Sequence, residues 1–280
     1  MQQKKLKIIG VIPARLGSTR LARKVLREIQ GKILIEQVYR RAAQSPLLDE
    51  LWIATDSREV EEACQKRKIP VVMTSEKHPS GTDRVYEVMT KKPADVFVNI
   101  QGDEPLVRKE HLEALLKPFL SPSPFPLPEG ERVGVRGEVA VSTLKIKLAA
   151  ELAKNPNVVK VVTDPKGWAL YFSRSPIPHD REGTGRNPFY KHLGFYAYRA
   201  EALEKFHKLP PSPLEQTEKL EQLRFLENGF RIFVAETAFD SIGVDTEEDL
   251  QRVEGLLAKE ANSPNTLAAK VSMSGKKQGV

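Results

Sequence analysis

Residues 8–24 read IIGVIPARLGSTRLARK, an apolar run that passes directly into a loop rich in cations, hydroxyl groups and glycine. Five apolar residues ending at Pro13 are too few for a signal-peptide core and fit a short buried strand. The loop is suited to phosphate groups, because backbone N–H groups and hydroxyls donate to phosphate oxygens while Arg15 and Lys24 neutralise their charge. It lacks the Gly-Lys-Ser/Thr of a Walker loop, and a solvated basic loop is the alternative interpretation.

Further apolar runs rich in β-branched residues alternate with amphipathic stretches along the chain. The pattern predicts strands at 8–13, 51–55, 71–74, 96–100, 139–146 and 158–163, and helices at 33–44, 58–67, 83–90 and 109–119. This alternation is typical of an α/β fold with a doubly wound, mostly parallel sheet flanked by helices. Ligands of such sheets bind beyond the carboxyl ends of the strands, so the segments that follow strands are the candidates for a functional site.

The length of 280 residues fits one large α/β domain or two small ones. We predict a single domain over residues 1–261, with an atypical proline-rich insert at about 120–138 and a flexible basic tail over 262–280. Alternating prolines followed by glycines exclude helix and central strand from the insert. It is predicted to form an extruded loop at the end of the sheet opposite the crevice, and a proline-rich docking motif is the alternative.

Charge and cysteine content limit the function classes. The formal net charge is +7, but lysines at the two ends supply six of these charges (Lys4, Lys5, Lys7, Lys270, Lys276 and Lys277), which argues against nucleic-acid binding. No run approaches the roughly 20 apolar residues of a membrane span. Cys64 is the single cysteine, which excludes an internal disulfide and fits a reducing compartment. We therefore expect a cytoplasmic protein without membrane insertion.

Two acidic residues follow predicted strands or apolar runs. Residues 96–105 read VFVNIQGDEP, which delivers Asp103 to the crevice edge, and residues 241–250 read SIGVDTEEDL, which places Asp245 at a helix entrance. Magnesium usually takes one or two protein carboxylates together with substrate phosphates, so this pair is a candidate metal site. Helix capping is the alternative, and Thr246 with Asp249 three residues later resembles a capping box.

The loop HPSGTDR at residues 78–84 follows the third predicted strand. Ser80 and Gly81 offer small groups and exposed amides that could bind the edge of a nucleotide base. The same residues could equally form an N-cap with ordinary turn chemistry.

Seven motifs occur in one order along the chain: PARxxSTR, HxSGTDR, NIQGDEP, YFSR, KHLGFYAYR, LEQLR and GVDTxEDL. Together they resemble the 3-deoxy-manno-octulosonate cytidylyltransferase family, also called the CMP-Kdo synthetases. The resemblance covers residues 7–258 apart from the proline-rich insert. Each motif alone is weakly specific, whereas the ordered set is highly specific.

The resemblance implies a nucleotide-diphospho-sugar-transferase-like fold with a mostly parallel mixed sheet. It also implies CTP and Kdo as substrates, Mg²⁺ as cofactor, a homodimer, and a product used for lipopolysaccharide. Arg15, Ser18 and Lys24 then lie at the CTP phosphates, and Asp103 and Asp245 hold the metal; Arg15, Lys24, Asp103 and Asp245 form the catalytic set. The cytidine region is implied to contain Ser80, Gly81, Thr82, Asp83, Arg84 and Gln101. The Kdo side is implied to contain Arg174, His192, Tyr196, Glu221 and Gln222, with Arg174 suited to the sugar carboxylate.

Several alternatives stay open at this point. His192 could be a hydrogen-bonded core histidine and Tyr196 a packing residue, while Glu221 and Arg224 could form a surface ion pair at helical spacing. The chain also departs from the family loop Leu-Pro-Gly-Lys, since it has Leu21-Ala22-Arg23-Lys24. Alternative functions are a cytidylyltransferase for another sugar acid, such as a sialic acid, or an inactive nucleotide-binding homologue.

Overall fold

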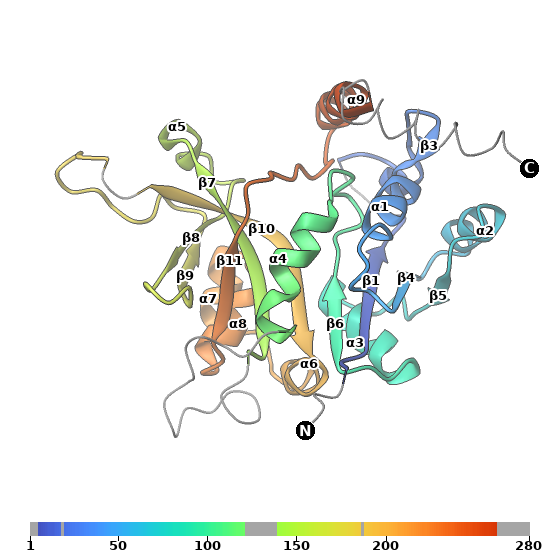
Figure 1. The fold of residues 1–280 in the computed structure, drawn as a ribbon, viewed down its shortest axis with the longest axis horizontal. Helices are drawn as coiled ribbons and strands as arrows, with labels where there is room; N and C mark the ends of the chain where they lie inside the picture. Colours follow the sequence, from blue (N-terminus) through green and yellow to red (C-terminus); the bar gives the residue numbers. More distant parts are fainter. Residues whose placement is uncertain (1–4, 18–19, 121–138, 186–187, 262–280) are drawn as a thin grey trace, which may run out of the picture.

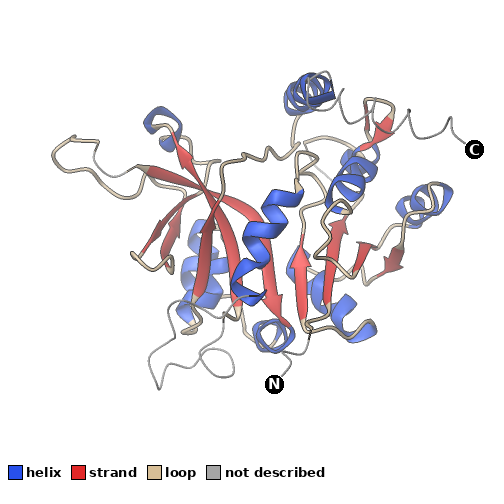
Figure 2. Cartoon of the chain, in the orientation of Figure 1, coloured by secondary structure: helices blue, strands red, loops and turns tan. Residues whose placement is uncertain are grey.

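The computed structural model describes residues 5–17, 20–120, 139–185 and 188–261. A nine-stranded sheet runs through these residues in the order β11-β7-β10-β6-β1-β4-β5, with β8 and β9 attached beside β10 (Figures 1 and 2). Its strands are β1 (Ile8–Ala14), β4 (Glu50–Thr55), β5 (Val71–Met73), β6 (Val96–Asn99), β7 (Val141–Leu148), β8 (Lys160–Thr163), β9 (Ala169–Ser173), β10 (Phe189–Arg199) and β11 (Ile232–Glu236). The predicted insert at about 120–138 and the predicted tail over 262–280 lie almost entirely outside the described residues.

Helices flank the sheet (Figure 2). They are α1 (Leu34–Ala42), α2 (Arg58–Lys66), α3 (Gly81–Lys91), α4 (Lys109–Leu120), α5 (Ala150–Ala153), α6 (Ala200–His207), α7 (Pro213–Glu218), α8 (Gln222–Glu227) and α9 (Glu247–Ala261). A 3₁₀ turn, η1 (Lys24–Leu26), and a small hairpin of β2 (Glu28–Ile29) and β3 (Lys32–Ile33) lie between β1 and α1. None of the described helices combines the length and apolarity needed to cross a membrane.

The predicted fold class is confirmed, and each of the ten predicted strands and helices is present with boundary shifts of one or two residues. β1 is a central strand because it pairs in parallel with β4 on one side and β6 on the other. The elements without a prediction are mainly β9–β11 and the short helices near them. β10 runs antiparallel to both β6 and β7, which makes the sheet mixed.

Alternation along β1 separates two cores. Ile8 and Ile12 point into a cluster shared with α1, α2 and α4, whereas Ile9 and Val11 point into a cluster shared with α3, α6 and α8. Successive strand residues face opposite sides of a sheet, so a strand that is apolar on both faces must be covered on both. The molecule therefore has three layers, with helices on each face of the sheet (Figure 1).

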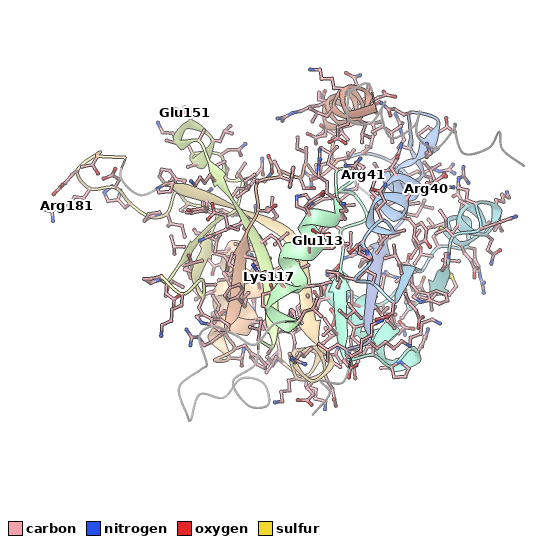
Figure 3. The ribbon with its side chains drawn as sticks, in the orientation of Figure 1. Arg40, Arg41, Glu113, Lys117, Glu151 and Arg181 are labelled. Atoms are coloured by element: carbon pink, nitrogen blue, oxygen red, sulfur yellow. The ribbon has the colours of Figure 1, made fainter. Side chains whose placement is uncertain are left out.

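One loop projects from this body. It joins β9 to β10, and its described part ends in an outer turn where Arg181 is exposed (Figures 1 and 3). The segment between β11 and α9 instead crosses the carboxyl ends of the central strands and brings α9 over β3 and α1 (Figure 1). Apolar residues of α9 pack there on Leu21, Ile29 and Leu34. The crossing segment is therefore what carries Asp245 towards the sheet edge.

Candidate functional site

The loops that follow β1 and β6 touch at the sheet edge. A Cβ atom added to Gly102 would lie 2.5 Å from the backbone oxygen of Pro13, which leaves no space for a side chain. Glycine at this position therefore allows close approach of the β1 backbone, and the resulting contact brings the loop containing Arg15 next to Asp103.

A polar hollow opens between these loops and the segment before α9. It is a cavity of about 350 Å³ lined by Arg15, Gly17, Arg20, Lys24, Val25, Gln101, Gly102, Asp103 and Asp245. The volume is within the usual range for small-molecule sites. Sequence reasoning therefore placed Arg15, Lys24, Gln101, Asp103 and Asp245 together correctly in space. Ser18, also predicted for this loop, lies outside the described residues.

Asp103 and Asp245 converge on one nitrogen atom. Lys24 Nζ donates to Asp103 Oδ2 at 2.6 Å and to Asp245 Oδ1 at 3.0 Å, and Arg20 pairs with Asp245 Oδ2 at 2.9 Å. Partial burial disfavours the charge on Lys24, but the two carboxylates outweigh it and raise the pKa of the ammonium above its ordinary value. One point in space is therefore within hydrogen-bonding distance of a carboxylate oxygen from each acid.

Local backbone features hold these side chains in place. The backbone N–H of Val244 donates to the carbonyl oxygen of Asp103 at 2.8 Å, which fixes the two acidic segments side by side. Thr246 and Asp249 form the reciprocal capping bonds that the sequence suggested, at 3.0 and 3.1 Å. Asp245 lies immediately before this cap, so its carboxylate remains available to the hollow.

Lys24 begins the turn η1, and Arg23 precedes it in the left-handed conformation with φ 55°. Glycine adopts that conformation without strain, whereas an L side chain costs roughly 1–2 kcal/mol. The Arg23 side chain forms an ion pair with Glu59 of α2. The position that glycine fills in the family loop therefore has a positive φ in this chain, and its arginine side chain contacts a neighbouring helix.

The N-terminus of α3 lies beside the same strand ends. Ser80 caps the helix by accepting from the backbone N–H of Asp83 at 3.2 Å, as the alternative interpretation of this loop predicted. A Cβ on Gly81 would lie 3.6 Å from Pro13 and 3.8 Å from the amide nitrogen of Asn99. Gly81 therefore lies beside Pro13 near the end of β1, so capping of α3 and a base-binding role of this loop are compatible.

Arg84 and Asp83 are less available to a ligand than the sequence suggested. Arg84 is fully buried, and its guanidinium contacts Asp56 at 2.6 Å and also Thr74. These two partners follow β4 and β5, so Arg84 ties the ends of neighbouring strands together. Asp83 accepts from Ser80 Oγ at 2.7 Å and lies 3.1 Å from His207. A contact of either residue with cytidine stays a prediction.

A second polar cluster lies deeper, where β10 passes β6. The hydroxyl of Tyr196 and that of Thr143 each lie 3.0 Å from His192 Nε2. Burial, with a smaller contribution from Lys191, lowers the pKa of His192 to about 3, so the ring is neutral at ordinary pH. His192 and Tyr196 are therefore hydrogen-bonded within the fold, which agrees with the core interpretation of His192. These bonds are also compatible with a ligand that contacts the cluster.

Gln222 begins α8 and Glu221 is its N-cap residue, and both belong to the same cluster. Thr82 Oγ1 donates to Glu221 Oε2 at 2.6 Å, which links α8 to the N-terminus of α3. Burial raises the pKa of Glu221. The suggested surface ion pair of Glu221 with Arg224 is wrong, because Glu221 is buried and Arg224 pairs directly with Glu215 at 2.5 and 2.7 Å.

Unpartnered polar atoms surround this deeper cluster. Within the described residues, Asn99 Oδ1, Glu104 Oε2, Glu221 Oε1 and Gln222 Nε2 are buried without a hydrogen-bond partner. Such atoms cost free energy unless a ligand or water satisfies them. Donors and acceptors of this kind suit a ligand rich in hydroxyl groups.

Sequence reasoning missed three residues of these two clusters. Arg20 belonged to the cationic loop but was not selected, although it contacts Asp245. Asn99 and Glu104 flank the selected Gln101 and Asp103 within one motif. Burial raises the pKa of Glu104 to about 7. The positions of Asn99 and Glu104 at the end of a predicted strand were a usable signal, whereas their burial was not visible in the sequence.

Arg174 lies on the wall formed by β9 and α7. Its guanidinium donates to the backbone oxygens of Glu218, Pro156 and Lys219 at 2.7, 3.1 and 3.4 Å. These bonds use three of the five guanidinium N–H groups, so one on Nη1 and one on Nη2 remain for a carboxylate. These contacts of Arg174 are therefore compatible with its role at the sugar carboxylate, which stays a prediction.

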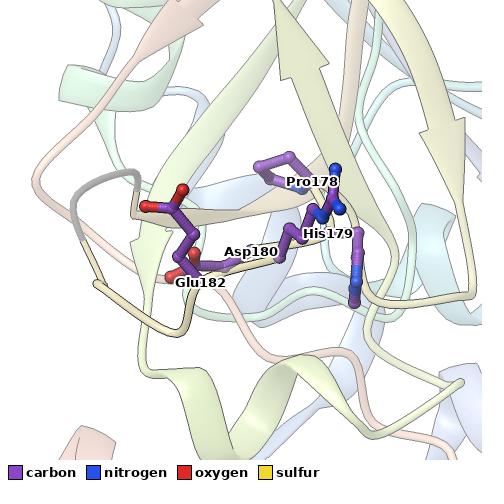
Figure 4. A pocket seen from close by; sticks show the side chains of 5 residues that line it. Pro178, His179, Asp180 and Glu182 are labelled. Carbon is purple, nitrogen blue, oxygen red and sulfur yellow. The ribbon is translucent and has the colours of Figure 1, made fainter.

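A further hollow on the projecting loop contains none of the predicted residues. It is lined by Pro178, His179, Asp180, Arg181 and Glu182 (Figure 4). Asp180 Oδ2 accepts from the backbone N–H of Gly185 at 2.7 Å, and further amides of the same turn lower the pKa of this carboxyl. The carboxylate of Asp180 therefore stabilises the loop's own turn.

Among the described residues, no group of three or more histidine, cysteine, aspartate or glutamate side chains could enclose a metal. Asp103 and Asp245 supply two hard oxygen ligands, which is the usual protein share of a magnesium site that is completed by phosphates and water. The position of Lys24 Nζ demonstrates that one cation can contact both carboxylates. The residues present therefore fit a magnesium ion.

Comparisons with known proteins agree with this geometry. A family model described as "Cytidylyltransferase" matches residues 9–232. The 3-deoxy-manno-octulosonate cytidylyltransferases of Koribacter versatilis and Acidobacterium capsulatum are each 51% identical over 252 residues, which cover 90% of this chain and 90% and 97% of theirs.

A solved structure of CMP:2-keto-3-deoxy-manno-octonic acid synthetase complexed with CTP superposes with a TM-score of 0.83. It is 42% identical and covers 91% of this chain and 99% of its own. Sequence identity, coverage and fold thus agree over almost the whole described molecule. The chain belongs to the 3-deoxy-manno-octulosonate cytidylyltransferase family of nucleotidyltransferases.

Proposed function

We propose that this protein transfers CMP from CTP to the anomeric C2 hydroxyl of Kdo, which forms CMP-Kdo and releases pyrophosphate. The observation that carries the proposal is the convergence of Asp103 and Asp245 within a hollow that also holds Arg15, Arg20 and Lys24. A hollow that combines two carboxylates with three cations suits a metal–triphosphate better than it suits a neutral ligand.

The sugar oxygen attacks the α-phosphorus of CTP, the bond from that phosphorus to the bridging oxygen of pyrophosphate breaks, and the hydroxyl proton passes to water. Arg15 and Lys24 neutralise charge on the leaving pyrophosphate. Asp103 and Asp245 would hold Mg²⁺, which withdraws charge from the phosphate and favours the attacking oxygen. The protein needs no side-chain nucleophile for this transfer, because its main tasks are positioning and charge stabilisation.

Cytidine and Kdo are assigned to the two remaining walls. Ser80, Gly81 and Thr82 at the start of α3, together with Gln101, face the base and ribose. Glu221, Gln222, His192 and Tyr196 face the sugar acid, since buried unpartnered oxygen and nitrogen atoms of Glu221 and Gln222 match hydroxyl groups. This assignment orders the site with the sugar deep in the fold and the triphosphate near the surface.

The wider biological setting belongs to the same proposal. We place the reaction in the cytoplasm, in a homodimer, within a pathway that supplies Kdo to lipopolysaccharide. The proposed unit of folding is a single domain over residues 1–261. A buried, free Cys64 is compatible with a reducing compartment, and burial raises the pKa of its thiol to about 11.

Pyrophosphate release tests the proposed reaction directly. Purified protein is given each of the four nucleoside triphosphates with Kdo or N-acetylneuraminate, with Mg²⁺ or with excess chelator. We expect release only with CTP, Kdo and Mg²⁺ together. Release with N-acetylneuraminate but not with Kdo would favour the alternative sugar acid, and no release with any pair would favour an inactive homologue.

A further inference from the structure

Lys24 occupies an unusual position between the two acids. Its side chain is 13% exposed, whereas those of Asp103 and Asp245 are 29% and 39% exposed, so the lysine is the most enclosed member of the triad. Its ammonium contacts Asp103 Oδ2 and Asp245 Oδ1 at the same time. In addition, Arg20 neutralises the second oxygen of Asp245.

Asp103 Oδ2 and Asp245 Oδ1, which accept from Lys24, are also the two oxygens that a metal held by both acids would bind. A magnesium ion bonds oxygen at about 2.0–2.1 Å, closer than the lysine nitrogen lies. An ammonium ion and a divalent cation cannot both occupy that point, because like charges at such a separation repel strongly. Binding of a metal to both carboxylates therefore requires Lys24 to leave them.

The hollow offers an alternative partner for the departing ammonium. Arg15, Arg20 and Lys24 all line it, and a triphosphate bound there would present several anionic oxygens. Lysine is a flexible point charge, so it can exchange one anionic partner for another at small conformational cost. Arg20 would keep one bond to Asp245 during this exchange.

We propose that Lys24 is an exchangeable internal counter-ion, which holds Asp103 and Asp245 together and excludes divalent metal until a bound triphosphate attracts its ammonium. This inference rests on the proposed function and adds a binding order to it. Free metal then binds the protein weakly, and nucleotide strengthens metal binding by removing the competitor. By linkage, the metal strengthens nucleotide binding to the same extent.

Titration of nucleotide-free protein with Mn²⁺, followed by the electron paramagnetic resonance of the free ion, tests this order. We expect Lys24→Met to bind Mn²⁺ about tenfold more tightly than the unaltered protein, because Lys24 makes two ion pairs and each is worth up to about fivefold. The variant would thus lose turnover while its metal affinity rises, an outcome that a purely structural lysine would not give.

Arg15→Met is the matched control. It removes one cation from the same hollow, but Arg15 donates to the backbone oxygen of Pro79 and not to either acid. Its effect on Mn²⁺ affinity should be within about twofold, as expected for a screened charge at 0.1 M salt. The double variant Lys24→Met with Asp103→Asn should lose the tightened binding, which assigns it to this carboxylate pair.

Lys24→Gln serves as a second variant if Lys24→Met does not fold, since its amide can still donate one hydrogen bond without charge. Unchanged or weaker Mn²⁺ binding in a folded Lys24 variant would overturn the counter-ion role, while metal-dependent pyrophosphate release by the unaltered protein would leave the proposed function standing. Absence of any metal-dependent release would instead overturn the proposed function, and the binding order with it.

Discussion

The two polar clusters of this molecule differ in how their charges are satisfied. In the outer hollow, each of Lys24, Asp103 and Asp245 has an oppositely charged partner on another segment. In the deeper cluster around Glu221, Gln222 and His192, neutral hydrogen bonds predominate and several buried atoms lack a partner. Ion pairs near the surface can exchange, whereas buried hydrogen bonds are fixed by packing. Variants of the hollow should therefore change mainly turnover, and variants of the cluster should change stability in addition to their effect on binding of the sugar acid.

The largest expected effect comes from Asp103→Asn in the hollow. The change keeps the shape of the side chain and removes one of two candidate metal-binding carboxylates, so we expect turnover to fall by about 100-fold or more. CTP binding measured by calorimetry should change by only a few-fold, because Arg15 and Lys24 remain. Near-normal turnover in this variant would remove the metal assignment.

Thr82→Val should give the largest loss of stability in the deeper cluster. It removes the 2.6 Å bond to Glu221 and leaves a buried carboxyl group with fewer partners, which should lower the free energy of unfolding by about 1–3 kcal/mol. Thr90→Val is the matched control on the same helix, because Thr90 is exposed and donates only to a backbone oxygen. Equal midpoints of urea unfolding for the two variants would contradict a buried role for Thr82.

His192 gives the cluster a dependence on pH. The unfolded chain binds the imidazole proton near pH 6.5 and the folded chain only near pH 3, so the unfolded state holds more protons between these values and stability falls as pH decreases. The lowered pKa of His192 should reduce the free energy of unfolding by about 2 kcal/mol as the pH falls from 7 to 5. The free energy of unfolding of His192→Gln, measured with urea, should lack this pH-dependent decrease. Burial also lowers the pKa of His111, but it is present in both proteins, so only the difference is assigned to His192.

The smallest effect is expected for Arg23→Gly, beside the hollow. Relief of the left-handed strain is offset by a more flexible unfolded chain and by loss of the exposed pair with Glu59, so stability should change by less than about 1 kcal/mol. Turnover should stay within about twofold, since η1 still begins at Lys24. A large loss of CTP affinity would instead indicate that the Arg23 side chain contacts the nucleotide.

The first half of the fold was predictable because each parallel strand there is apolar on both faces and each helix is amphipathic. These local patterns identified β1, β4, β5 and β6, and the rule that ligands bind beyond strand ends identified Asp103. The second half depends on pairing between distant segments. Nothing local in residues 189–199 shows that β10 runs antiparallel to β6, because strand direction is set by the chain's path and not by its pattern.

Burial explains the remaining differences at the site. Arg84 was predicted to bind the ligand, yet it is fully buried and its contacts with Asp56 and Thr74 connect the ends of β4 and β5. Glu104 was not selected, yet its carboxyl group is enclosed beside Asp103. Charge and position in a motif were readable in the sequence. Whether a charged side chain points to the crevice or into the fold depends on tertiary packing that one sequence does not specify.

Crystals grown with CTP and Mn²⁺, measured at a wavelength where manganese scatters anomalously, test the central claim most directly. We expect an anomalous peak within bonding distance of Asp103 and Asp245, with the Lys24 ammonium displaced onto the triphosphate. A peak elsewhere in the crevice, or an ammonium still seated between the two acids beside bound nucleotide, would contradict it.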